Sequence, residues 1–165
     1  MKIESLAIPD VKLLTPKIHA DPRGFFVESW NRRLLQEHGI DIEFVQDNHS
    51  LSVPKGTVRG MHFQAPPFAQ IKLVRCTRGS ILDVAVDLRT GSPTFGQAVT
   101  AMLSAENMQQ LLVPEGFAHG FCTLEQNTEV LYKVNAYYSA ECDGGIAWDD
   151  QALGIDWPVT AEEVL

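Results

Sequence analysis

The chain is divided into short strand-like runs that are separated by turns. The runs are rich in apolar and β-branched residues, and turns recur about every 8–12 residues, a spacing typical of an all-β sandwich or barrel. One helix is expected at Asn31–His38, ended by Gly39, and a second helical turn at Ser104–Asn107. The remaining pattern predicts strands over Val11–Ile18, Gly24–Glu28, Ile42–Ser50, Thr57–Gln64, Gln70–Thr77, Ser80–Leu88, Gly96–Leu103, Gln109–Val113, His119–Leu124 and Glu129–Tyr137.

One run, Ile81–Leu88, indicates what kind of β fold to expect. Every second residue from Leu82 onward is apolar, whereas the other face combines Asp83 and Asp87 with Ile81 and a small residue. A strand with one dry face and one acid-bearing face suits a barrel wall, with packed core outside and a cavity within. An ordinary half-exposed edge strand explains this run equally well.

Length and composition limit the class of protein. The 165 residues suffice for a single domain, 1–165, that buries its own core. A formal net charge of −8 argues against a binder of nucleic acids or membrane surfaces. The first five residues lack the apolar core of a signal peptide, no apolar run is long enough to span a membrane, and three scattered cysteines form no disulfide or zinc pattern. We therefore expect a cytoplasmic protein with reduced thiols.

The segment Pro114–His119 has the form Pro-x-Gly-x-x-His. The proline fixes the approach, Gly116 supplies the positive φ of a tight hairpin, and His119 starts the next strand. This pattern resembles the second signature motif of cupins, which are small double-stranded β-helix (jelly-roll) barrels. The resemblance implies an all-β cupin jelly roll with a few short helices. The alternative is a generic hairpin that carries a structural histidine.

The first cupin motif is incomplete in this chain. Metal-dependent cupins usually carry His-x-His followed by Glu, whereas the corresponding place here reads Met61-His62-Phe63-Gln64. His62 and His119 alone lack the third protein ligand that a catalytic zinc or iron centre normally needs. We therefore expect no metal and no other cofactor, which leaves both histidines free for acid–base chemistry.

Cationic and polar residues accompany His62. Arg59 precedes it by three residues, Gln64 follows it by two, and Lys72 falls on the next strand. A lone strand histidine would more often be a satisfied core residue, but burying a positive cluster for packing alone is costly. The cluster is explained if an anion, such as an enolate or a phosphate, fills the space between these side chains.

Two tyrosine positions are less informative by themselves. Tyr132 lies in an apolar run and, taken alone, is best interpreted as a core aromatic residue. Tyr137 and Tyr138 precede a polar loop, where an aromatic ring can present a flat surface to a nucleobase.

Taken in order along the chain, these stretches resemble the dTDP-4-dehydrorhamnose 3,5-epimerase family of nucleotide-sugar metabolism. The resemblance covers nearly the whole sequence. It is carried by Asp21–Phe26, Phe44–Ser50, Val58–Gln64, Lys72–Cys76, Ser92–Gly96, Pro114–Phe121, Tyr132–Lys133, Ile146–Asp150 and Ile155–Pro158.

The resemblance implies a role for individual residues. It makes His62 the proton acceptor and Tyr132 the proton donor, and it places Tyr138 where an aromatic ring stacks on thymine. Asp143 occupies a contact position that usually holds Glu. The family is metal-free and dimeric, so two of the contact residues are expected to reach the partner's site, namely Arg23 and Glu28. The remaining substrate-contact positions are Gln46, Asp47, Asn48, Arg59, Lys72 and His119.

One feature departs from the family pattern. Members usually continue past Trp-Pro to a Lys-Asp pair whose Asp supports the catalytic histidine, and no Lys-Asp pair follows Trp157-Pro158 here. Either that tail is absent, or another acid orients His62, and Asp83 is then the candidate because it lies on the cavity face of its strand.

The implied activity is epimerisation at C3 and C5 of dTDP-4-dehydro-6-deoxy-D-glucose, without a cofactor, to give dTDP-4-dehydro-L-rhamnose. A ketone at C4 acidifies the neighbouring C–H bonds, and a base and an acid on opposite sides of the ring invert each carbon. Three alternatives remain at this stage: a one-centre epimerase or ketoisomerase of a related keto-deoxysugar nucleotide, a non-catalytic sugar-nucleotide-binding cupin, and a metal-dependent cupin dioxygenase.

Overall fold

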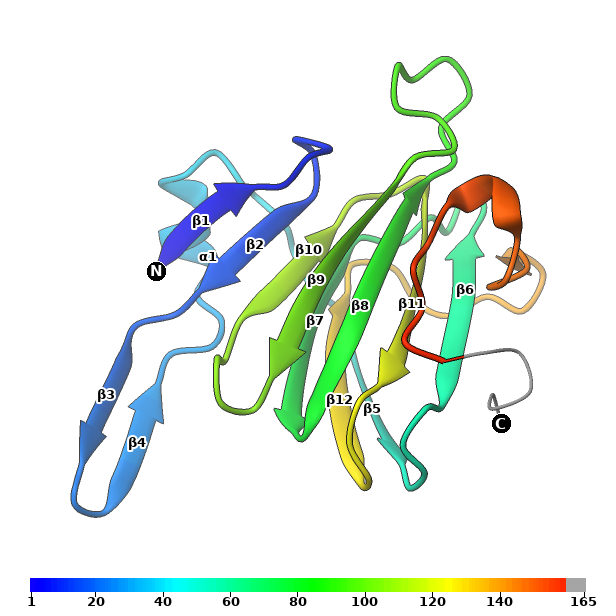
Figure 1. Cartoon of the computed structure of the whole chain (residues 1–165). Coiled ribbons are helices and arrows are strands. Elements are labelled where there is room, and N and C mark those ends of the chain that lie inside the picture. The colour runs from blue at the N-terminus through cyan, green and yellow to red at the C-terminus, as the bar shows by residue number, and fades with distance from the viewer. Residues whose placement is uncertain (160–165) are drawn as a thin grey trace.

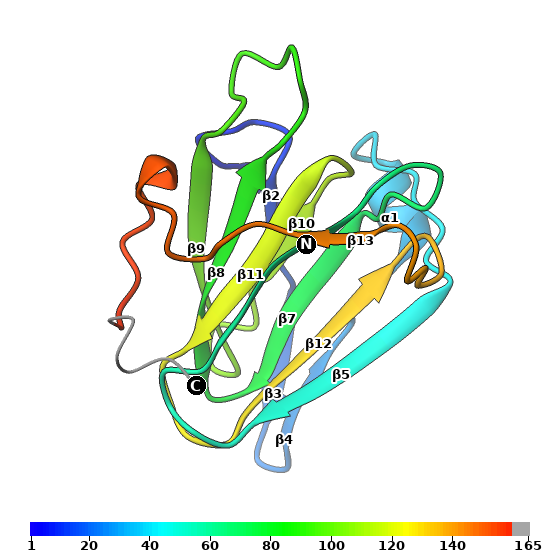
Figure 2. The same ribbon diagram turned by 90° about the vertical axis from the view of Figure 1, so that its right-hand side faces the viewer.

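Two antiparallel sheets lie face to face in the computed structural model, which describes residues 1–159 (Figures 1 and 2). The six-stranded sheet has the order β1-β2-β10-β7-β12-β5, and the five-stranded sheet has the order β13-β6-β11-β8-β9. The strands of the six-stranded sheet are β1 Lys2–Ser5, β2 Lys12–Thr15, β10 Gln110–Val113, β7 Lys72–Arg78, β12 Thr128–Val134 and β5 Gln46–Ser52. Those of the second sheet are β13 Asp143–Gly145, β6 Val58–Gln64, β11 Phe117–Thr123, β8 Ser80–Asp87 and β9 Ala98–Ser104.

Strands that are distant in the sequence are neighbours in both sheets. β10 lies between β2 and β7, and β11 lies between β6 and β8. This arrangement is the expected cupin jelly roll, and the alternative of a generic hairpin around Pro114–His119 is wrong. The core between the sheets draws on both of them: Val74, Cys76, Leu111 and Val130 from one side meet Ile81, Ala85, Phe117 and Phe121 from the other.

β8 is a wall of this barrel and not an edge strand, because β11 and β9 pair with its two sides. Its residues Ile81 and Ala85 pack in the core between the sheets. Val84 and Val86 face outward and are covered by the C-terminal segment. The alternating pattern therefore predicted the packed outer face correctly, whereas the inner face, which was expected to line a cavity, packs in the core between the sheets. The covering residues are Ile146, Trp148, Leu153, Ile155 and Trp157, which include part of a short 3-10 helix, η1 Gln151–Leu153.

The expected helix is present but shorter. It is α1, Arg32–Gln36, with Asn31 as the N-cap whose side chain accepts a hydrogen bond from the Leu34 amide. Gly39 follows with φ of 77°, as the helix end requires. Buried Leu35 packs with three leucines on the outer face of the six-stranded sheet, namely Leu14, Leu73 and Leu112.

The expected helical turn at Ser104–Asn107 is present as a single turn between β9 and β10, closed by a hydrogen bond from the Met108 amide to the Ser104 oxygen, and it does not continue into a helix. The Asn107 side-chain oxygen accepts hydrogen bonds from the amides of Ser104 and Gln109, which compete with helix formation. Three strands were not expected from the sequence: β1, β13 and a short strand, β3 Ile18–Asp21.

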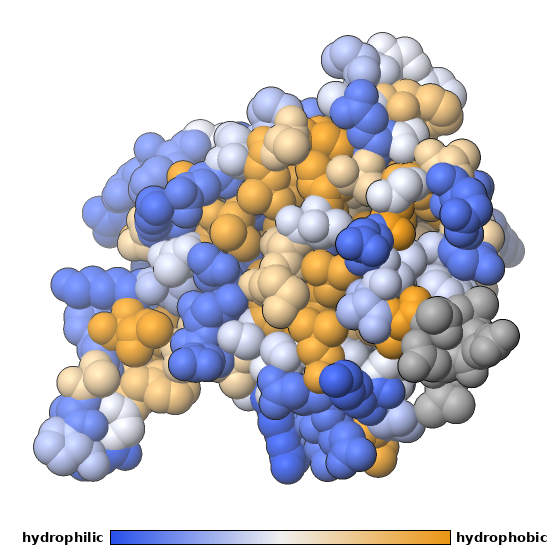
Figure 3. Space-filling model, viewed as in Figure 1, coloured by the Kyte–Doolittle hydropathy of each residue, from blue (hydrophilic) through white to orange (hydrophobic). Residues whose placement is uncertain are grey.

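β3 pairs with β4, Gly24–Val27, in a hairpin that projects away from the two sheets (Figure 1). Three of its apolar side chains are exposed: Ile18, Phe25 and Phe26, the last to 70%. Apolar side chains also gather over the outer face of β8 and β9 (Figure 3). Within residues 1–159, no helix is long and apolar enough to cross a membrane.

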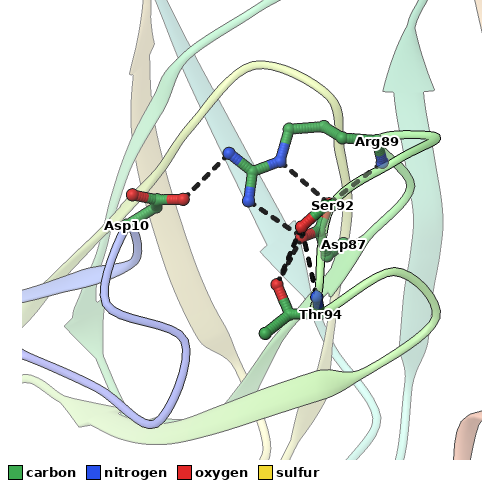
Figure 4. Close-up of polar contacts among 5 residues, drawn as sticks. All are labelled: Asp10, Asp87, Arg89, Ser92 and Thr94. Carbon is green, nitrogen blue, oxygen red and sulfur yellow. Dashed lines mark hydrogen bonds and ion pairs between the residues drawn. The ribbon is translucent and has the colours of Figure 1, made fainter.

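A buried carboxylate organises the loop between β8 and β9 (Figure 4). Asp87 accepts hydrogen bonds from Nε and Nη2 of Arg89 and from the hydroxyls of Ser92 and Thr94, all at 2.6–2.9 Å. Arg89 also reaches Asp10 in the β1–β2 loop, with 2.9 Å between Nη1 and Oδ2. These donors, Arg89 first among them, hold the pKa of the Asp87 carboxyl well below its ordinary value.

Candidate active site

A cavity of about 510 Å³ opens between the two sheets. Three of the strands that line it belong to each sheet: β5, β7 and β12 to one, and β6, β11 and β13 to the other. Seven residues expected at the site line this cavity: Arg59, His62, Lys72, His119, Tyr132, Tyr138 and Asp143. The topology therefore brings together residues that are far apart in the sequence, such as Arg59 and Asp143, which are separated by 84 positions.

His62 and His119 are directly opposite one another on the paired strands β6 and β11. His119 is buried, and its Nε2 shares a 2.7 Å hydrogen bond with Oδ1 of Asp83, which is fully buried. The expectation that Asp83 orients His62 is therefore wrong. β11 lies between β8 and β6 in the sheet, so the Asp83 carboxylate meets the histidine of the intervening strand first.

His62 is the more accessible of the two histidines, and the described part of the chain gives its imidazole no hydrogen-bond partner. Burial lowers the pKa of His62 below its ordinary value, and the positive charge of Lys72 lowers it further, while Asp143 opposes the shift. The ring therefore stays neutral at pH 7. A neutral imidazole is the form that can accept a proton.

Lys72 is a buried cation on the cavity wall. Its side chain is held by a 3.3 Å hydrogen bond from Nζ to the backbone oxygen of His62. Burial lowers the pKa of Lys72 to about 8, against the opposing charges of Asp83 and Asp143. The amine is therefore still largely protonated near neutral pH, and it can stabilise a negative charge that develops beside it.

Tyr132 lies on β12, in the sheet opposite to that of His62, and both line the same cavity. Burial raises the pKa of the Tyr132 phenol, although the positive charge of Arg59 works against this. The phenol therefore remains protonated and can act as a proton donor. A base and an acid thus face the cavity from its two walls.

Arg59 connects the two sheets at this cavity. Its Nε donates to Oγ of Ser52 at 2.9 Å, and its Nη2 donates to the backbone oxygen of Leu51 at 3.3 Å. Arg59 belongs to β6, whereas Ser52 and Leu51 belong to β5. The guanidinium therefore sits where an anionic group entering the cavity would meet it.

The aromatic ring of Tyr138 stands at the rim of the cavity, and the residue is 61% exposed. Its hydroxyl donates to Oδ2 of Asp143 at 3.4 Å, and its backbone amide donates to Oε1 of Gln46 at 3.2 Å. An exposed ring held in this way is suited to stack on a flat heterocycle.

Comparison with known proteins identifies the family. The family model described as dTDP-4-dehydrorhamnose 3,5-epimerase matches residues 5–165. A dTDP-4-dehydrorhamnose 3,5-epimerase of Sinorhizobium fredii is 55% identical over 165 residues, which cover 100% of this chain and 85% of the relative. This chain belongs to the dTDP-4-dehydrorhamnose 3,5-epimerase family.

Solved structures of this family share the fold. A Bacillus anthracis dTDP-4-dehydrorhamnose 3,5-epimerase with TDP and PPi bound superposes with a TM-score of 0.95 at 53% identity, covering 97% of this chain and 91% of that one. A Legionella pneumophila epimerase in complex with dTDP-4-keto-L-rhamnose gives a TM-score of 0.92 at 45% identity, covering 97% and 85%. The fold and the family assignment therefore agree.

Five residues that the epimerase family pattern implies do not line the cavity of their own chain, namely Arg23, Glu28, Gln46, Asp47 and Asn48. Asp47 points to the outer face of its sheet, where it pairs with Lys133 at 2.8 Å, because its neighbours in β5 take the inner face. Asn48 accepts a 2.9 Å hydrogen bond from Nε2 of Gln46. Arg23, in the projecting hairpin, forms an ion pair with Asp21. Glu28, just beyond the hairpin, accepts a hydrogen bond from the side chain of Asn31.

Sequence reasoning missed several residues of this epimerase site. Ser50, Gln70 and Phe121 line the cavity. Phe121 lies two residues after His119 in β11, so strand alternation was a usable signal for it. Gln64, noted only as a neighbour of His62, is buried and holds the loop before Tyr138: its Nε2 donates to the backbone oxygens of Phe68 and Tyr137, and its Oε1 accepts from the Ser139 amide.

A catalytic metal ion normally needs at least three protein ligands. Among residues 1–159, no three His, Cys, Asp or Glu side chains lie together as metal ligands would. His119 is already committed to Asp83, and His62 is flanked by the Lys72 ammonium. That this epimerase-family chain needs no metal or cofactor stays a prediction, to be tested as described below.

Proposed function

We propose that this chain epimerises dTDP-4-dehydro-6-deoxy-D-glucose at C3 and C5, giving dTDP-4-dehydro-L-rhamnose. The observation that carries the proposal is the placement of a neutral imidazole, His62, and a protonated phenol, Tyr132, on opposite walls of one cavity. Inversion at carbon requires removal of a proton from one face and return of a proton to the other. A single group could do only one of these.

In the proposed mechanism, the C4 ketone of the sugar first acidifies the C–H bonds at C3 and C5. His62 takes a proton from one of these carbons, and the electrons of the C–H bond move onto the C4 oxygen as an enolate. The ammonium of Lys72 stabilises that oxygen. Tyr132 then gives its phenolic proton to the opposite face of the carbon. Before the second carbon reacts, the His62 imidazolium releases its proton to solvent and the Tyr132 phenolate takes one from solvent.

The remaining cavity groups bind the substrate in this proposal. The His119 ring, fixed by Asp83, offers its second nitrogen to a sugar oxygen. Arg59 provides positive charge for the anionic part of the nucleotide. Tyr138 stacks on the thymine at the rim of the cavity. Its ring is held by the hydrogen bond from its hydroxyl to Asp143, and its backbone by the hydrogen bond from its amide to Gln46.

We further propose that the protein works as a homodimer. Arg23 and Glu28 lie outside the chain's own cavity, in and beside the projecting β3–β4 hairpin. Exposed apolar side chains on that hairpin, Phe25 and Phe26, and on the edge strand β5, Leu51, support burial against a second copy. In such a dimer, Arg23 and Glu28 would complete the partner's site.

The cellular setting is also a proposal. The free thiols of Cys76 and Cys122 are buried, and burial raises the pKa of each to about 11, so neither is a reactive thiolate. Cys142 is also a free thiol and is only partly buried, and an accessible free thiol is typical of a reducing compartment, so we place the protein in the cytoplasm. The acidic composition supports a small-molecule substrate and no nucleic-acid partner.

Deuterium incorporation tests the reaction directly. The enzyme is incubated with dTDP-4-dehydro-6-deoxy-D-glucose in D₂O, and the product is analysed by NMR. We expect deuterium at both C3 and C5 of the product. Deuterium at one carbon only would instead identify a one-centre epimerase, and no incorporation would leave only a binding protein.

A further inference from the structure

Arg59 and His62 are three residues apart in β6, yet both line the cavity. Side chains alternate along a regular strand, so residues three apart should face opposite sides. Met61 and Phe63 obey the alternation relative to His62, because both pack on the outer face of the five-stranded sheet. Arg59 is therefore the residue whose direction needs an explanation.

The pairing of β6 with β11 contains that explanation. His62 is opposite His119, and Arg59 is opposite Phe121, so three steps along β6 match two steps along β11. Gly60 and Met61 together oppose the single residue Gly120. This is a β-bulge, and the extra residue returns Arg59 to the cavity side of the sheet.

The bulge depends on two glycines that touch across the strands. A Cβ at Gly60 would lie 2.5 Å from Cα of Gly120, and Gly60 has φ of 139°, which disfavours other residues. A Cβ at Gly120 would lie 2.8 Å from the backbone oxygen of Arg59 and 3.0 Å from Cα of Gly60. These three contacts are with backbone atoms, which cannot move aside as a flexible side chain such as Met61, whose Sδ lies 2.6 Å from the same Gly120 Cβ position, can.

Ser52 holds the far end of the arginine. It is buried, with 3% of its surface exposed, and its Oγ accepts the 2.9 Å hydrogen bond from Nε of Arg59. Arg59 has no acceptor of its own and a long flexible side chain, so its guanidinium stays in one place only where fixed acceptors hold it. The bulge thus sets where the side chain starts, and Ser52 sets where it ends.

We infer that Ser52 and the Gly60–Gly120 bulge are positioning elements that hold the Arg59 guanidinium ready for the anionic part of the substrate. The inference rests on the proposed function, in which Arg59 binds that part of the nucleotide sugar. Ser52 and the two glycines need not touch the substrate themselves. Their contribution to catalysis passes through Arg59.

Substitution of Ser52 tests the inference. Ser52→Ala should lower kcat/KM about 10-fold, the scale of one lost hydrogen bond to a charged group, mostly through a higher KM. Ser52→Thr keeps the hydroxyl and should recover most of the loss. Thr128→Val is the matched control, because Thr128 is the buried β12 residue paired with Ser52, and its hydroxyl donates to the backbone of Glu125, away from Arg59.

A double-mutant cycle separates positioning from general destabilisation. Arg59→Ala should lower kcat/KM, and adding Ser52→Ala to it should cause little further loss. Independent, multiplying effects would overturn the inference while leaving the role of Arg59 intact. A wild-type kcat/KM for Arg59→Ala would overturn both the inference and that part of the proposed function.

The glycines are tested on the opposite strand. Gly120→Ala should raise KM more than Ser52→Ala does, and Cys122→Ala, two residues further along β11, serves as the control for a buried change in the same strand. Thermal melting accompanies each assay, and the Ser52 series decides the question if Gly120→Ala does not fold. A folded Gly120→Ala protein with wild-type KM would contradict the role of the bulge.

Discussion

The Asp87 cluster allows a stability prediction whose size follows from its contacts. Asp87→Asn keeps the shape of the side chain but replaces one carboxylate oxygen by an NH₂ group, which now faces hydrogen-bond donors. The hydroxyls of Ser92 and Thr94 can rotate and accept from that group, whereas the guanidinium of Arg89 can only donate. The main cost is therefore the loss of the charged acceptor of Arg89, whose side chain is 35% exposed and keeps its contact with Asp10.

Losing hydrogen bonds to a charged group costs about 1.5–3 kcal/mol, the scale that applies here because Arg89 remains partly exposed and paired with Asp10. For a chain of this size, each kcal/mol lowers Tm by about 2–4 °C, so we expect Asp87→Asn to lower Tm by about 3–12 °C at pH 7. Circular dichroism melts and urea titrations measure the difference. Asp10→Asn is the control: Asp10 contacts the same guanidinium, but its side chain is 56% exposed, and a surface pair contributes about 0–1 kcal/mol.

The effect should also depend on pH with a definite sign. The pKa of folded Asp87 lies below its ordinary value of 3.8, so its contribution to stability is complete above that value and is lost as the pH falls towards the folded pKa. The difference between wild type and Asp87→Asn should therefore shrink below about pH 4. A loss under about 1 kcal/mol at pH 7, or one equal to that of Asp10→Asn, would refute this account of the cluster.

Four further predictions concern the reaction. His62→Ala should lower turnover at least ~10²-fold, the scale of a lost general base, and a folded variant within a few-fold of wild type would remove His62 from that role. Tyr132→Phe should still bind the nucleotide sugar and still exchange the substrate proton with D₂O, while inverted product falls sharply; undiminished inversion would place the donor elsewhere. Treatment with EDTA should leave activity unchanged, and a loss that a divalent ion restores would show a metal requirement. The value of kcat/KM should fall on the acid side below pH 6.5, since the pKa of His62 is lowered, and on the basic side near pH 8, where Lys72 loses its proton. Lys72→Met should abolish the basic limb of this pH profile and move the acid limb to higher pH. An unchanged profile would contradict both assignments.

Much of the fold could be predicted from the sequence because alternation and turn residues encode it locally. The run Ile81–Leu88 predicted a strand with an apolar outer face against packed side chains and an acid-bearing inner face towards a cavity. The outer face packs as expected, whereas Ile81 and Ala85 of the inner face pack in the core between the sheets. β13 could not be predicted in the same way. It contains Gly144 and Gly145, which have no strand preference, and it pairs with β6 because Gly144 lets the strand pass over the ring of Phe63.

The site shows the same limit. Strand patterns and motifs indicated His62, His119 and Lys72, whereas only the family resemblance indicated Tyr132. All four line one cavity. The partner of Asp83 was mistaken, because the order of strands in a sheet depends on the whole topology and not on any local pattern. The direction of Arg59 likewise depends on a bulge whose cause, contact between glycines on different strands, is invisible in one strand alone.

Because the base and the acid lie on separate sheets, the distance between the two sheets affects which carbon they can reach. His62 belongs to the five-stranded sheet and Tyr132 to the six-stranded sheet, and the apolar layer around Val74, Ile81 and Val130 sets the gap between them. A change in that layer can shift one wall relative to the other without altering either chemical group. The carbon that loses its proton, and hence the stereochemistry of the sugar made, can therefore be retuned by ordinary core substitutions far from the substrate.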